Sequence, residues 1–179
     1  VNFISNYLYF QINIYKKVLT IAEHITINAD INKIWPFLID FSLSLNLNRF
    51  HTKLELPAQY SIGKLKKFKI DHNFGFGKYE MVAEITDCIP PNKLCLWEYC
   101  VDDKKKGFPH KVEFHIEPDG NKCTLSYTVT GTYGGKVQDM SFKPILKGVI
   151  IEELLKIKNA IESSENVTKP LASETGKPI

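Results

Sequence analysis

One long amphipathic segment near the C-terminus, residues 139–163, most constrains how this chain can fold. Its apolar side chains recur every three or four residues, which is the spacing of one face of an α-helix. These positions are Phe142, Leu146, Val149, Ile150, Leu154, Ile157 and Ile161. Almost everything between residues 17 and 133 shows the alternation of β-strands instead. A sheet with one apolar face needs a cover, so we expect this helix to pack on that sheet.

The strand-like segments follow one another at short intervals. The breaks between them include Pro90-Pro91 and Asp119-Gly120, which favour turns. Strands joined by such short links pair antiparallel and twist, so the sequence predicts one curved antiparallel sheet of about seven strands. The expected strands are residues 17–28, 51–57, 63–72, 78–89, 92–102, 110–118 and 122–133.

The region between the first two strands is expected to form two short helices. Asp30 is a suitable N-cap for a helix over residues 31–40. Pro36 is tolerated in a first turn and otherwise divides this helix into two pieces. Residues 41–51 alternate like a strand, but their place directly after a helix favours a second helix. The predicted fold class is therefore α+β, with the sheet wrapped around the long C-terminal helix.

The predicted domain covers residues 17–163. Residues 1–16 form an extension that lacks a basic start and a cleavage pattern, so it is a poor signal peptide, and it is too short and polar to span a bilayer. Residues 164–179 are polar, carry two prolines and are expected to be a disordered tail. The formal net charge of +3 is too small to indicate a nucleic-acid partner.

The cysteines at positions 88, 95, 100 and 123 have neither CxxC spacing nor a zinc-ligand pattern. This distribution predicts free thiols in a reducing compartment, and therefore a cytoplasmic protein. A disulfide from Cys95 to Cys88 or to Cys100 is the alternative, and it would require export.

Three side chains are candidates for proton transfer. His72 has the same strand parity as Ile70, and His110 has the same parity as Phe114, so both imidazoles point inward if those faces are buried. Glu98 lies in a strand that is apolar on both faces. If it is buried we expect its pKa to rise, and the alternative is a surface pair with a lysine. His51 is expected at the surface, at a corner between helix and strand.

Motifs for cofactors are missing from the sequence. It contains no HxxxH, HExxH, GxSxG or GKS/T pattern. The glycines of residues 75–77 precede a strand and not a helix, so they do not form a phosphate loop. We therefore expect no metal and no other cofactor.

The segments ITINADINKIWPFLID, AEITDCIPPNKLCLW and EPDGNKCTLSYTVTG, with Gly63 at a strand start and the terminal helix, occur in a characteristic order. Over residues 17–163 this order resembles the START-like, or helix-grip, superfamily, in particular its SRPBCC group of polyketide cyclases/dehydrases and lipid-transport proteins. Pro36 and residues 1–16 depart from the pattern. Members of this family have a ligand cavity, and both departures affect the expected shape of its mouth.

The resemblance implies a deep apolar cavity between the sheet and the long helix, and a hydrophobic small molecule or lipid as partner. An enzyme of cyclase or dehydratase type, using His72, His110 or Glu98, is the alternative. A protein-interaction module is a third hypothesis. The expected cavity lining is Phe68, Ile70, Met81, Trp97, Tyr99, Phe114, Tyr127, Phe142, Leu146 and Ile150.

Four lysines close together in the sequence bear on which partners the protein binds. Lys64, Lys66, Lys67 and Lys69 form a basic strand edge. It is expected to be a solvated face that discourages pairing with other strands. The alternative is a transient contact with the anionic headgroups of a membrane surface. The sequence does not specify an oligomeric state.

Overall fold

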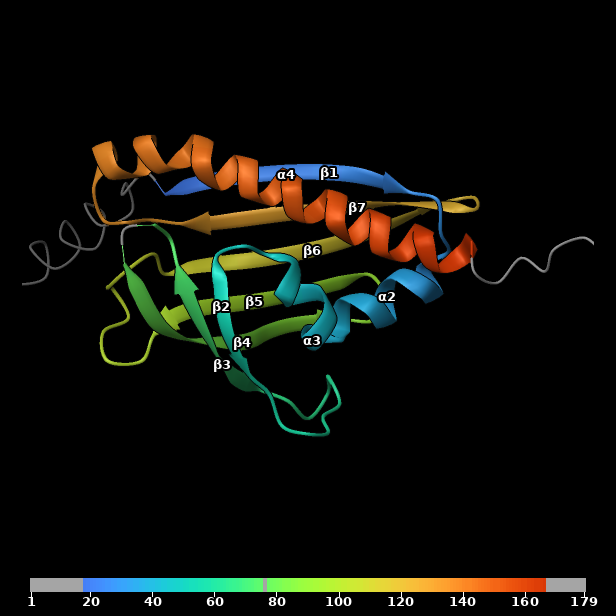
Figure 1. Cartoon of the computed structure of the whole chain (residues 1–179), viewed down its shortest axis with the longest axis horizontal. Coiled ribbons are helices and arrows are strands. Elements are labelled where there is room, and N and C mark those ends of the chain that lie inside the picture. The colour runs from blue at the N-terminus through green and yellow to red at the C-terminus, as the bar shows by residue number, and fades with distance from the viewer. Residues whose placement is uncertain (1–17, 76, 167–179) are drawn as a thin grey trace, which may run out of the picture.

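The computed structural model describes residues 18–75 and 77–166. Its centre is a seven-stranded antiparallel sheet with the strand order β1-β7-β6-β5-β4-β3-β2 (Figure 1). From β2 to β7 each strand pairs with its neighbour in sequence, as short connections require, and β1 pairs with the last strand. The strands are β1 (Leu19–Ile27), β2 (His51–Glu55), β3 (Lys67–Asn73), β4 (Lys78–Ile89), β5 (Lys93–Cys100), β6 (His110–Asp119) and β7 (Lys122–Gly131).

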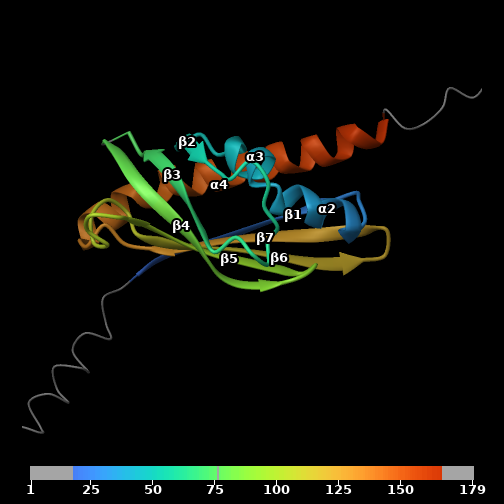
Figure 2. The same cartoon turned by 90° about the horizontal axis from the view of Figure 1, so that it is seen from below.

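The helices cover one face of this sheet. They are α2 (Ile31–Ile39), α3 (Phe41–Ser44), the 3-10 helix η2 (Leu45–Leu47) and α4 (Lys136–Asn166). Figure 2 shows the sheet from below, with α4, α2 and α3 on the same side and with β2 and β3 curling towards them. The predicted α+β architecture of a curved sheet around a long C-terminal helix is confirmed, including the short helices after the first strand. Within the described ranges, no helix is long and apolar enough to cross a membrane.

Three details differ from the sequence-based expectation. The strand β3 begins at Lys67, so Gly63, which was expected to open it, lies in a turn before it. Pro36 lies inside α2 and not in its first turn, yet the helix continues to Ile39 as one piece. Trp35 and Leu38 are buried on either side of it, so packing holds the helix together despite the missing backbone donor. The long helix extends three residues beyond each expected end. Residues 1–16, expected as an extension, lie outside the described residues, and so do residues 167–179 of the tail expected over residues 164–179. Residues 164–166 belong to α4 instead.

The turn into α4 is fixed by a buried carboxylate. Asp139 accepts hydrogen bonds from the backbone N–H of Tyr133 at 2.7 Å and from the hydroxyl of Thr132 at 2.7 Å. These bonds connect the first turn of the helix to the end of β7. They set the position from which α4 presents its apolar face to the sheet.

Aromatic rings fill the space between this end of α4 and the sheet. Phe142 of α4 lies 5.3 Å from Phe108, 5.9 Å from Phe50 and 5.9 Å from Phe74, measured between ring centroids. All four rings are buried. Such pairs stabilise a core beyond the area that they bury, so this aromatic layer anchors α4 to the strands.

Adjacent residues of α4 allow a direct test of this packing. Ile150 is fully buried, whereas Ile151 is 39 % exposed. Ile150→Lys is expected to lower the free energy of unfolding by more than about 3 kcal/mol, because it buries an unpaired charge. Ile151→Lys is the matched control and should change it by less than about 0.5 kcal/mol. Urea unfolding measures both, and equal effects of the two variants would contradict the packing of α4 on the sheet.

Candidate functional site

A carboxylate lies between two imidazoles on the concave face of the sheet. The Oε2 atom of Glu98, in β5, is 3.0 Å from Nε2 of His72, in β3, and 3.2 Å from Nε2 of His110, in β6. Glu98 and His72 are each only 1 % exposed. The structure thus brings together all three predicted proton-transfer candidates and excludes the alternative of a surface pair between Glu98 and a lysine.

The strand register explains how these side chains meet. Glu98 is directly opposite His110 on β6 and directly opposite Ala83 on β4. His72 approaches them from β3, the strand on the other side of β4, where it is paired with Tyr79. Gly131 of β7 is opposite His110, and a Cβ atom there would lie 2.6 Å from the His110 Cβ and 2.7 Å from the Pro109 carbonyl oxygen. Only glycine therefore permits this placement of His110.

The pKa of Glu98 does not follow the expected direction for a buried acid. Burial acts to raise this pKa, but the charge of His110 and the close approach of His110 and His72 outweigh it. The pKa of Glu98 is consequently held well below its usual range. Glu98 is an ionised carboxylate that holds two imidazoles in place, and it is a poor base. Of the three groups, the imidazoles are the ones with the chemistry to exchange protons or to bind a cation.

His51 is a further member of this cluster that the sequence analysis placed at the surface. Its ring centroid is 4.6 Å from that of His72, and its Nδ1 atom is 2.6 Å from the Leu45 carbonyl oxygen. Burial and the neighbouring charge of His72 lower the pKa of His51 to about 3. The pairing of β2 with β3 shifts register just after His51, so strand alternation could not place this side chain.

Two phenylalanine rings separate the cluster from α4. Phe74 stacks on His72 with 5.0 Å between ring centroids, and Phe108 stacks on His110 at the same separation. Both rings also contact Phe142 of α4. The aromatic layer therefore forms a roof over the histidines and Glu98.

An apolar pocket opens on the other side of this aromatic layer. It has a volume of about 370 Å³, and it lies at the start of α4. Phe74 lies beneath it, with its ring centroid 5.8 Å from that of Tyr79, 6.2 Å from Tyr133 and 5.9 Å from Phe142. The lining residues are Tyr79, Tyr133, Val137, Gln138, Ser141 and Phe142.

The predicted lining residues divide between the two faces of the sheet. Trp97 and Tyr99 alternate with Glu98 and lie on the opposite, convex face, so their expected place in the cavity lining is wrong. There the Tyr99 hydroxyl donates to Glu84 at 3.1 Å, and Lys104 lies over the Tyr99 ring. Both faces of β5 bury side chains, which hid its orientation in the sequence. The others are buried on the concave side: Phe68, Ile70, Met81, Phe114, Tyr127, Phe142, Leu146 and Ile150.

Another buried carboxylate, Glu153, could not be found from strand alternation because it lies in α4. It is 1 % exposed, and its Oε2 atom accepts a hydrogen bond from the Asn48 amide at 2.7 Å, with the Tyr127 hydroxyl as another partner. Burial raises the pKa of Glu153 to about 8, against the effect of these two hydrogen bonds. The signal was present in the sequence, because Glu153 follows Ile150 by three residues and precedes Ile157 by four.

The raised pKa of Glu153 predicts a pH-dependent stability. Between about pH 4.5 and pH 8 the folded state holds a proton that the unfolded state has lost. Stability therefore falls as pH rises through this window, by up to about 1.4 kcal/mol per pH unit, and levels off above it. Glu153→Gln keeps the hydrogen-bonding shape and should remove this slope in urea unfolding between these pH values.

The adjacent, partly exposed Glu152 supplies the control for this measurement. It pairs with Arg49 and Lys156 at the surface, so Glu152→Gln should leave the slope between pH 5 and pH 8 as it is in the parent protein. A Glu153→Gln variant with the same slope as the parent protein would show that Glu153 is ionised in the fold.

The chain resembles several solved structures in its fold, although its sequence matches no known family. No protein-family model matches the sequence, and a search of curated proteins finds no match. A conserved protein from Geobacillus kaustophilus superposes with a TM-score of 0.63 at 23 % identity, covering 82 % of this chain and 97 % of its own. A START superfamily protein from Mycobacterium smegmatis gives a TM-score of 0.58 at 15 % identity, covering 83 % of this chain and 99 % of its own.

A third similar structure is the di-domain ARO/CYC protein StfQ from the steffimycin biosynthetic pathway. It superposes with a TM-score of 0.62 at 14 % identity, covering 83 % of this chain and 52 % of its own. These likenesses are at the level of the fold. Together with the order of the strands and the position of α4, they confirm the fold that the resemblance implied. This chain has the START-like, helix-grip fold.

Proposed function

We propose that this protein binds a hydrophobic small molecule at the junction of α4 and the sheet. The observation that carries the proposal is the apolar pocket above Phe74. Its volume of about 370 Å³ lies within the range of roughly 300–1,000 Å³ that is typical of small-molecule sites. Its aromatic walls match what such sites use to bury a ligand. START superfamily and ARO/CYC proteins among the structural neighbours support the same reading.

Tyr133 supplies a polar point within this apolar surface. Its hydroxyl is buried and has no hydrogen-bond partner among the described residues. Burial raises the pKa of Tyr133, so the hydroxyl stays protonated and can donate. A ligand with an apolar body and one carbonyl, ether or hydroxyl oxygen would satisfy this donor. A few such groups are what orient a ligand in an apolar pocket.

Phe74 determines how far a ligand can enter. Its ring is 3 % exposed and separates the pocket from the histidine cluster. Gly75 and Gly77 follow it with positive φ angles of 86° and 153°, and Gly134, across the pocket, has a φ of 87°. We infer that a small ligand occupies the pocket as it stands, and that a longer one, such as a lipid chain, displaces Phe74 into the space between sheet and helix.

Two exposed positions of α4 provide a test that leaves the core intact. Ser141 lines the pocket, whereas Lys143 is exposed nearby and does not line it. Ser141→Trp should fill the pocket and weaken binding of the uncharged fluorophore N-phenyl-1-naphthylamine by about tenfold or more, equivalent to roughly 1.4 kcal/mol. Lys143→Trp should bind like the parent protein. Fluorescence titration measures both.

Circular dichroism and unfolding midpoints serve as the check that both variants are folded. Equal affinities of the two variants would place the fluorophore elsewhere and contradict the proposed site. Native mass spectrometry of the gently purified protein gives an independent observation, because a co-purified apolar molecule that is absent from Ser141→Trp would identify the ligand.

A further inference from the structure

The cluster beneath Phe74 has the donor atoms of a metal site. His51, His72 and Glu98 each place one ligand atom within 4.8 Å of the other two. The three come from β2, β3 and β5, which are separate strands. No linear motif could therefore reveal them, and the expectation of no metal rested on linear motifs alone.

The buried atoms of this cluster lack aligned partners. Both ring nitrogens of His72 and both carboxylate oxygens of Glu98 have no hydrogen-bond partner among the described residues. The distances of 3.0 and 3.2 Å between Glu98 and the imidazoles are short, but the directions are not those of hydrogen bonds. Leaving one buried polar group unsatisfied costs about 1–3 kcal/mol, and more if the group is charged. These unsatisfied atoms are therefore free to bind a further group.

Backbone carbonyls fix which ring nitrogen is free. The carbonyl oxygens of Leu45 and Phe108 lie 2.6 Å from Nδ1 of His51 and 2.7 Å from Nδ1 of His110. A carbonyl oxygen only accepts, so each Nδ1 carries the hydrogen, and in a neutral imidazole the lone pair is on Nε2. At His110 that Nε2 is 3.2 Å from the Glu98 carboxylate. In the neutral form of His110 this lone pair faces the Glu98 carboxylate, and a cation between the two atoms would be bound by both.

We propose that His51, His72 and Glu98 bind a divalent transition-metal ion such as Zn²⁺, with His110 as a fourth ligand. Imidazole nitrogen with one carboxylate suits Zn²⁺ and its neighbours, whereas Mg²⁺ and Ca²⁺ prefer sites made of oxygen. Metal-binding histidines commonly donate their other ring N–H to a backbone carbonyl, as His51 does here.

The geometry needs only a small contraction to hold the ion. Ligand atoms about 2.1 Å from a tetrahedral Zn²⁺ lie roughly 3.4 Å apart. Closing a separation of up to 4.8 Å to that value requires side-chain rotation and no movement of the sheet. The half-buried His51, on edge strand β2, is the ligand with the most freedom to make this adjustment.

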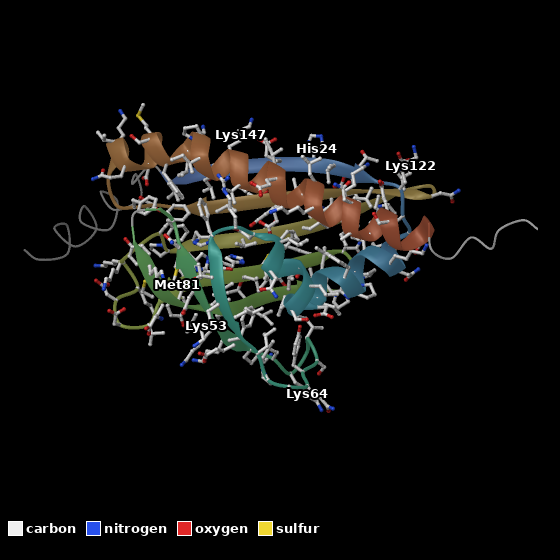
Figure 3. All side chains as sticks on the ribbon, in the orientation of Figure 1. His24, Lys53, Lys64, Met81, Lys122 and Lys147 are labelled. Carbon is white, nitrogen blue, oxygen red and sulfur yellow. The ribbon has the colours of Figure 1, made fainter. Side chains whose placement is uncertain are left out.

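The test is a calorimetric titration of ZnCl₂ into untagged protein that has been treated with a chelator. The parent protein is expected to bind a single ion per chain, and Glu98→Gln and His51→Gln should each weaken the affinity by at least about tenfold. His24→Gln is the control, because His24 is an exposed histidine on the outside of β1 (Figure 3). It should bind Zn²⁺ like the parent protein.

Co²⁺ provides a second readout that does not depend on the variants. Its visible d–d absorption reports a tetrahedral nitrogen and oxygen environment in the folded parent protein and should be displaced by Zn²⁺. His51→Gln keeps the test decisive if Glu98→Gln does not fold, since His51 is only half-buried. Absence of Zn²⁺ binding by the folded parent protein, or equal affinities of His51→Gln and His24→Gln, would overturn the proposal. Both readouts are independent of any apolar ligand.

Discussion

The apolar face of α4 lying against the concave side of the sheet is the contact on which the other features depend. Phe142, Ile150 and Ile157 are each at most 1 % exposed, and burying such a side chain contributes roughly 1.5–3 kcal/mol. Because α4 covers one face of the sheet, the alternation along each strand decides whether a side chain points towards the helix or away from it. Glu98 goes inward and its neighbours Trp97 and Tyr99 go outward as a direct result.

Periodicity in the sequence was sufficient to predict the strands, the first short helix and α4, because each has a regular spacing of apolar residues. The second short helix was inferred from its position after the first, against the strand-like alternation of residues 41–51. Periodicity was insufficient at β5, where both faces are apolar and only the partners Ala83 and His110 reveal the direction of Glu98. It was also insufficient at His51, where the register shifts within the strand. Glu153 differs from these, because its place in the helical spacing could be read from the sequence.

Glu98 and Glu153, two carboxyl groups buried in this interior, differ in whether they are ionised at neutral pH. Neighbouring imidazoles hold the pKa of Glu98 well below its usual range, whereas burial raises the pKa of Glu153 to about 8. Their exposure is the same, at 1 % each. The difference arises from their partners, which are bases for Glu98 and an amide and a phenol for Glu153. Of these two carboxylates, Glu98 is therefore the one that is an anion at neutral pH, next to the histidines.

Phe74 belongs to two compartments at once. Its ring contacts Tyr133 and Phe142, which line the apolar pocket, and it also stacks on His72 in the polar cluster. Any displacement of this ring alters both compartments together. If the proposed ligand displaces this ring, occupancy of the pocket and the state of the histidines become coupled equilibria, and such coupling is reciprocal. A cation bound in the cluster below the ring would then change the affinity of the pocket for its ligand by some factor. A ligand bound in the pocket would change the affinity of the cluster for the cation by that same factor.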